Sequence, residues 1–197
     1  MKFSALAGML MLSMVVSIGN ASIVDVTAAD DGDGVVTCTT NYAADLLTID
    51  GTHNLPDVGH VTGTITTDTA VDPTLSFWNS LENDTGLPWV GYHINVSMDQ
   101  PFTISPDSVL TPADWSSAIT SQPVLVGSSY VGQVDYSAGT PLANGGTLTF
   151  GYAITFSGST MYGFCQEMIP VSVPEPATLA LVTCGLLGLF ALRRRSA

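Results

Sequence analysis

The central part of this chain has no lysine and no arginine. The four basic residues of the 197-residue sequence lie at its two ends, whereas 16 of the 17 acidic residues, all except Glu175, lie between residues 22 and 172. No salt bridge to lysine or arginine can form there, so each carboxylate must be hydrated, hydrogen-bonded or bound to a cation. Such a surface repels phosphate backbones, which argues against nucleic-acid binding. Without lysine, a P-loop is excluded as well.

Cysteine is also scarce. Cys184 lies in a C-terminal apolar stretch, which leaves Cys38 and Cys165 as the only pair in the central part. Outside the cytoplasm, two cysteines of one domain usually pair. We therefore expect a Cys38–Cys165 disulfide, with two buried thiols as the alternative. In the chain-entropy model a bridge over so long a loop contributes roughly 4–5 kcal/mol.

Sequence signatures of catalysis are missing too. There is no G-x-S-x-G nucleophile elbow. Glu82 and Asp84 are close in sequence, but a glycosidase needs two carboxyl groups that face each other across roughly 5–9.5 Å. Turn formation explains these two residues better. We expect a protein that is not an enzyme and needs no cofactor, calcium aside.

The N-terminus reads as an export signal. Lys2 precedes an apolar stretch over residues 3–18, and Gly19-Asn20-Ala21 then offers small residues for cleavage before Ser22. This pattern is typical of a secretory signal peptide over residues 1–21, which would pass through Sec-type export machinery. A retained N-terminal anchor is the alternative.

The C-terminus carries a motif, an apolar stretch and a basic cluster. Val173, Pro174, Glu175 and Pro176 precede the uninterrupted apolar residues 177–192, and Arg193, Arg194 and Arg195 follow. Sixteen helical residues would span about 24 Å, less than the ~30 Å of a bilayer core. We expect a marginal transmembrane helix over residues 177–192. The arginines favour the cytoplasmic side and so keep the preceding domain outside.

This tail resembles the PEP-CTERM sorting signal of certain Gram-negative bacteria. The resemblance rests on Pro174-Glu175-Pro176, the short hydrophobic stretch and the terminal arginines. It implies recognition by an exosortase-type transpeptidase, removal of the tail, and release or re-attachment at the cell surface. It also implies an association with extracellular polysaccharide. An ordinary C-terminal membrane anchor is the alternative. The expected organisation is a signal peptide (1–21), an acidic domain (22–172) and a sorting signal (173–197).

The acidic domain has the period of β-strands. In residues 147–156, for example, every second residue from Leu148 to Phe156 is apolar, the pattern of a strand with one buried face. Eight to ten such segments with turns between them predict an all-β fold, an antiparallel β-sandwich of immunoglobulin-like or jelly-roll type. His93 falls on the outward side of its strand. A short helix is expected only near Thr111–Trp115.

Two groups of residues could bind a cation. Asp30, Asp31 and Asp33 alternate with glycine, as oxygen ligands of calcium do, although Ala29 and Thr40 occupy key ligand positions of an EF-hand loop. His53, Asp57 and His60 offer zinc-type ligands, but their spacing matches no established pattern. A polar turn and a surface loop are the respective alternatives.

The sequence thus favours an exported, non-enzymatic surface or extracellular-matrix module. A secreted carbohydrate-active enzyme and a cation-dependent adhesin are the alternatives. Sugar stacking would require exposed aromatic side chains. The four candidates for such stacking are Trp78, Trp89, Tyr92 and Trp115. Core packing is the preferred interpretation for most of them.

Overall fold

The computed structural model of the chain describes residues 22–68 and 73–173, and in this part of the chain the regular structure is entirely β-strand. The strands are β1 (Ile23–Asp30), β2 (Val36–Ala43), β3 (Leu46–His53), β4 (Gly59–Thr67), β5 (Thr74–Asn83), β6 (Trp89–Met98), β7 (Phe102–Thr111), β8 (Ser116–Val126), β9 (Ser129–Leu142), β10 (Thr147–Phe156) and β11 (Met161–Ser172).

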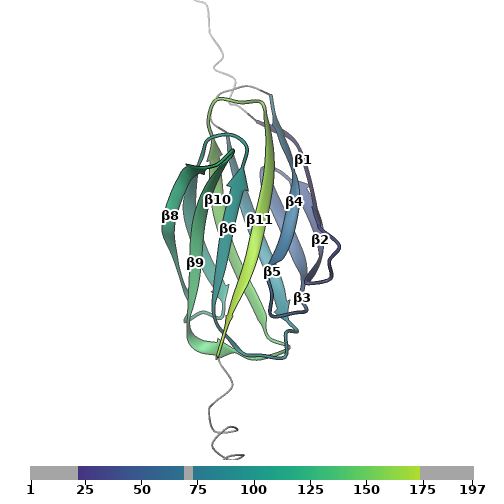
Figure 1. Cartoon of the computed structure of the whole chain (residues 1–197), viewed down its shortest axis with the longest axis vertical. Helices are drawn as coiled ribbons and strands as arrows, with labels where there is room; N and C mark the ends of the chain where they lie inside the picture. Colours follow the sequence, from purple (N-terminus) through teal and green to yellow (C-terminus); the bar gives the residue numbers. More distant parts are fainter. Residues whose placement is uncertain (1–21, 69–72, 174–197) are drawn as a thin grey trace, which may run out of the picture.

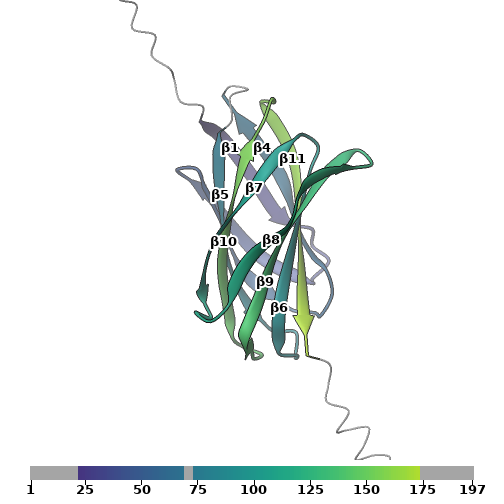
Figure 2. The ribbon, with the colours of Figure 1, turned by 90° about the vertical axis from the view of Figure 1, so that its left-hand side faces the viewer.

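The strands form two sheets that pack face to face (Figures 1 and 2). The six-stranded sheet has the order β1-β4-β11-β6-β9-β8, and the five-stranded sheet has the order β2-β3-β5-β10-β7. The predicted β-sandwich is therefore confirmed. The expectation of antiparallel pairing holds for the six-stranded sheet, but the other sheet is mixed, because β3 pairs with β5 in parallel. The chain crosses to the other sheet as β4 between them, so β3 and β5 run in the same direction.

The core lies between the two sheets and follows the two-residue period. Leu148, Phe150, Tyr152, Ile154 and Phe156 of β10 are all buried, as their alternation predicts. In β6 the alternation breaks at its first residues, where the register with β9 shifts between Trp89 and Gly91. This irregularity turns Trp89 into the core, where its side chain is fully buried, although strict alternation places it outside.

A buried polar group connects the two sheets. Gln166 of β11 donates from Nε2 to Asn79 Oδ1 of β5 at 2.9 Å, and it accepts a hydrogen bond from the Tyr152 hydroxyl of β10. All three side chains are fully buried. Because a buried polar atom is costly without a partner, these bonds favour one relative placement of the sheets.

The predicted Cys38–Cys165 disulfide is wrong, because both cysteines are free. Cys165 alternates along β11 with buried Phe164 and Gln166, so its side chain faces the outer surface of the six-stranded sheet. Cys38 packs instead against the core between the sheets. The two thiols therefore lie on opposite faces of the six-stranded sheet, which no disulfide can span.

The helix predicted near Thr111–Trp115 is also wrong. Thr111 ends β7, and the next residues form one tight turn in which the Trp115 N–H donates to Pro112 O at 3.2 Å. The Trp115 indole is buried and donates to Thr140 O at 2.9 Å. The buried indole just before β8 holds this segment against the sandwich.

The described chain begins at one end of the sandwich and finishes at the other (Figure 1). At the far end, the N–H of Val173 donates to Pro88 O at 3.1 Å, so the fold holds the chain up to this residue. The predicted signal peptide, the 177–192 segment, and Pro174, Glu175 and Pro176 lie outside the described residues. Within residues 22–68 and 73–173, no helix has the length and hydropathy to cross a membrane.

Candidate metal site

The loop between β1 and β2 is shaped by its own aspartates. Asp31 Oδ1 accepts the Asp33 N–H at 3.2 Å, and Asp33 Oδ1 accepts the Val35 N–H at 2.8 Å. Gly32 and Gly34 provide the positive φ angles, 77° and 81°, that such tight turns require. One oxygen of each carboxylate is thus engaged by the backbone, while the side chains of Asp31 and Asp33 remain exposed.

Asp30 has a different role from the one expected of it. Its Oδ1 accepts the Gly32 N–H at 3.2 Å, and its Oδ2 accepts the Cys38 N–H at 3.0 Å on β2. One oxygen therefore shapes the loop after β1, and the other joins β1 to the start of β2. Of the three aspartates predicted as calcium ligands, the structure brings only Asp31 and Asp33 to a shared group of donor atoms.

His60 of β4 is the third member of that group. It alternates with buried Gly59 and Val61, so it lies on the outer face of the six-stranded sheet. The donor atoms of Asp31, Asp33 and His60 all lie within 4.8 Å of one another. No local pattern in the sequence indicates this group, because His60 lies 27 positions after Asp33. The β1–β4 register, which pairs Asp30 with Val61, places them together.

His53 and Asp57 are separate from this group. His53 is fully buried; its Nδ1 lies 2.8 Å from the Tyr92 hydroxyl and its Nε2 lies 2.9 Å from Asp57 O. Asp57 O can only accept, so Nε2 is the donor, and in the neutral ring Nδ1 then accepts the tyrosine proton. Burial lowers the pKa of His53 below its usual value. The predicted set of His53, Asp57 and His60 is therefore divided between the core and the surface.

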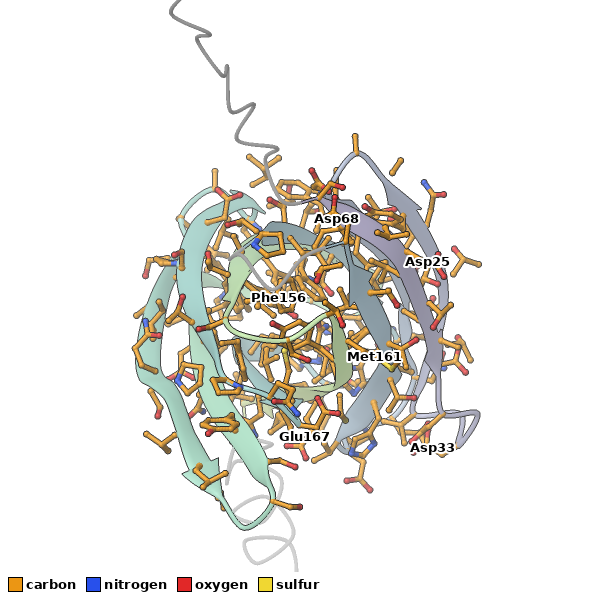
Figure 3. All side chains as sticks on the ribbon, turned by 90° about the horizontal axis from the view of Figure 1, so that it is seen from above. Asp25, Asp33, Asp68, Phe156, Met161 and Glu167 are labelled. Atoms are coloured by element: carbon orange, nitrogen blue, oxygen red, sulfur yellow. The ribbon has the colours of Figure 1, made fainter. Side chains whose placement is uncertain are left out.

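The surroundings of His60 are strongly acidic. The Asp33 N–H, and to a lesser degree His60, hold the pKa of Asp31 below its usual value of 3.8. Glu167 is the cross-strand neighbour of His60 on β11, and it accepts a hydrogen bond from Asn95 Nδ2 at 2.9 Å. Figure 3 shows Asp33 and Glu167 on the same side of the molecule. Residues 22–173 contain no lysine or arginine to neutralise these carboxylates.

The other histidine of this face makes a simple pair. His93 Nδ1 lies 2.7 Å from Asp135 Oδ1 on the neighbouring strand β9. This agrees with its expected outward position. The pair contains one carboxylate and a short hydrogen bond, whereas His60 lies near two carboxylates.

A shallow groove of about 480 Å³ lies on the same outer face. Its polar lining residues are Thr62, Thr64, Ser97, Asp99, Ser129 and Cys165. Among its lining residues the only aromatic one is Phe164, whose side chain is buried in the core. Such a lining can offer hydroxyl and carboxylate hydrogen bonds to a polar ligand.

The remaining candidates are placed elsewhere. Trp89, Tyr92 and Trp115 are core residues, whereas Trp78 is half-buried on the outer side of β5. Glu82 and Asp84 are both exposed, and the Asp84 N–H donates to His53 O at 2.9 Å. This hydrogen bond joins the loop after β5 to the end of β3.

The comparisons with known proteins concern the C-terminal end. Residues 172–195 match the PEP-CTERM protein-sorting motif. No curated protein and no solved structure matches the chain. The motif begins at Ser172, the last residue of β11. It implies processing by exosortase and an exported protein that is sorted to the cell surface.

Proposed function

We propose that this protein is a non-enzymatic structural or binding module of the cell surface or extracellular matrix, associated with extracellular polysaccharide. The observation that carries the proposal is the position of the sorting motif, which starts at the last residue of β11. Because the fold holds the chain up to Val173, removal of the tail near the Pro174-Glu175-Pro176 motif would leave the whole sandwich intact. The delivered product is then the sandwich itself.

The placement of the reactive side chains supports a non-enzymatic role. His53 is fully buried, so it cannot reach a substrate. Burial, reinforced by Asp30, raises the pKa of Cys38 to about 11, and burial together with Glu167 raises the pKa of Cys165. A thiol with a raised pKa is a poor nucleophile at neutral pH.

The outer face of the six-stranded sheet supports an association with polysaccharide. The groove beside Thr62 and Thr64 offers hydroxyl groups, with Asp99 as a carboxylate acceptor. Sugars present many hydroxyl groups, which such side chains can bind through hydrogen bonds. The absence of lysine and arginine from the domain also favours neutral glycans over anionic ones.

Mass spectrometry of the protein recovered from cells and medium tests the sorting step. We expect a mature form that lacks residues 1–21 and lacks the C-terminal tail. The variant Glu175→Ala should retain its tail, and the control Glu82→Gln, an exposed residue of β5, should be processed like the parent protein. An intact C-terminus in all recovered protein would contradict the proposal.

The role after sorting is tested with the processed protein. We expect it to co-sediment with extracellular polysaccharide of the producing cells and to release no reducing sugar from it. Release of sugar that grows with protein concentration would instead support the carbohydrate-active enzyme. Failure to co-sediment would remove the polysaccharide part of the proposal and leave the sorting result unaffected.

A further inference from the structure

We propose that Asp31, Asp33 and His60 form a binding site for a divalent transition-metal ion of the zinc class. The site lies where the β1–β2 loop meets β4, at the outer face of the six-stranded sheet. It is independent of the proposed function, since it rests only on the side chains of these three residues and their surroundings.

The first support is the geometry of the donor atoms. A carboxylate oxygen of Asp31, one of Asp33 and a ring nitrogen of His60 lie within 4.8 Å of one another. Three ligands around one ion at about 2.0–2.2 Å each must lie at most roughly 4 Å apart, so small side-chain rotations suffice. The loop already fixes the other oxygens of both carboxylates through the N–H groups of Asp33 and Val35, which leaves one oxygen of each carboxylate for the ion.

The second support is the state of the His60 ring. Its Nδ1 atom is buried and, among the described residues, has no hydrogen-bond partner. It lies 3.2 Å from Asp31 Oδ2 without forming a hydrogen bond to it, and the rest of the ring is partly exposed. His93 differs, because its Nδ1 makes a 2.7 Å hydrogen bond to Asp135. A buried nitrogen that lies beside two carboxylates and has no hydrogen bond is an arrangement that a bound cation would satisfy.

The donor types decide between cations. Calcium takes six to eight oxygen ligands and has little affinity for imidazole, whereas zinc accepts one nitrogen and two carboxylate oxygens with water in a remaining position. Glu167 beside His60 adds negative charge, and no lysine or arginine of the domain competes for the carboxylates. The same acidic surface therefore attracts cations in general, while His60 selects those that bind nitrogen.

Isothermal titration of the full-length protein, purified without a histidine tag, tests this site with zinc chloride and calcium chloride as probes. We expect one zinc ion per chain and a rise in melting temperature with zinc. His60→Asn and Asp33→Asn should each weaken zinc binding roughly tenfold or more. His93→Asn, which alters the comparable histidine of the same face, should bind zinc like the parent protein.

Three results would overturn the proposal. These are unchanged zinc affinity in both His60→Asn and Asp33→Asn, no zinc binding at millimolar concentration, or calcium binding that is as tight as zinc binding and depends on the same residues. Circular dichroism of each variant shows whether it is folded. Because Asp33 is exposed, its variant is expected to fold even if the His60 variant does not.

Discussion

The three histidines of this protein have three different environments within one sandwich. His53 is enclosed by the core and bonded to Tyr92, His60 faces two aspartates, and His93 pairs with a single one. In each case the local alternation of the strand decides whether the ring points inward or outward, and the neighbouring strands decide what it meets. Only the alternation can be predicted from the sequence, because the neighbouring strands depend on the fold.

The buried His53 makes stability depend on pH. Its folded-state pKa lies below the unfolded value of about 6.5, so protonation favours the unfolded state. The stabilisation is complete above about pH 6.5 and is lost as the pH falls toward the folded pKa, with a loss of ~1.4 kcal/mol for each unit by which the pKa is lowered. Urea unfolding at pH 7.5, 6.5 and 5.5 should show this decrease.

Two variants isolate the contribution of His53 from that of the other titrating groups. His53→Gln should be less stable than the parent at pH 7.5, because it disturbs the bond to Tyr92, but its stability should fall less between pH 7.5 and 5.5. Tyr92→Phe, which removes the same hydrogen bond but keeps the imidazole, should retain the parent slope, because burial is the main cause of the lowered pKa of His53. Parallel pH profiles for the parent and His53→Gln would show that the buried ring does not control this transition.

Sequence reasoning identified the acidic loop but not the complete cluster. The alternation of carboxylates and glycines pointed correctly to a loop of tight turns, and Asp31 and Asp33 belong to the cluster. His60 could not be assigned to it, because its proximity follows from the pairing of β1 with β4. The same limit explains the wrong disulfide, since the faces that Cys38 and Cys165 occupy depend on sheet assignment rather than on their separation in sequence.

Among the elements, the strands with the clearest alternation were the best predicted. The bounds of β10 agree with the predicted segment 147–156, because one of its faces is continuously apolar. The strand β1 has only a weak signal in the sequence, since Asp25, Ala28 and Ala29 have low strand propensity. It forms at the sheet edge because β4 provides a partner. The parallel β3–β5 pair was equally inaccessible, as it follows from a chain crossing between sheets.

The close approach of β1 to β4 requires a glycine at position 63. A Cβ atom there would overlap the carbonyl oxygen of Thr27 on β1 and would lie 2.8 Å from a ring carbon of Phe164. We predict that Gly63→Ala lowers the free energy of unfolding by about 1–3 kcal/mol, the usual cost of overpacking. Hydrogen exchange should accelerate most at the amides of β1, since this edge strand can separate from β4.

Gly163→Ala is the matched control for that substitution. Gly163 lies in β11 of the same sheet, and a Cβ atom there would meet only Asp99, at 3.5 Å, an ordinary van der Waals contact. This variant should retain the parent stability. Equal stability losses in both variants would mean that the effect comes from strand propensity rather than from the β1–β4 contact.

At the scale of the whole molecule, strands of both sheets carry carboxylates and none carries lysine or arginine. The 16 acidic residues between positions 22 and 173 face no lysine or arginine, and only the histidines can offset them. The sandwich nevertheless closes around a continuous apolar core. Repulsion between carboxylates therefore opposes a fold that hydrophobic burial stabilises, and screening by salt reduces only the repulsive part.

This balance predicts that salt stabilises the protein. Raising sodium chloride from about 10 mM to about 150 mM shortens the Debye length from ~30 Å to ~8 Å, so the melting temperature should rise, by about 2–4 °C for each kcal/mol of repulsion relieved. Scanning calorimetry in the presence of a chelator separates this effect from binding at Asp31, Asp33 and His60.

Potassium and choline chloride should act like sodium chloride at equal ionic strength, because screening does not depend on the cation. A melting temperature that stays constant or falls would mean that the carboxylates are too well hydrated for their repulsion to affect stability.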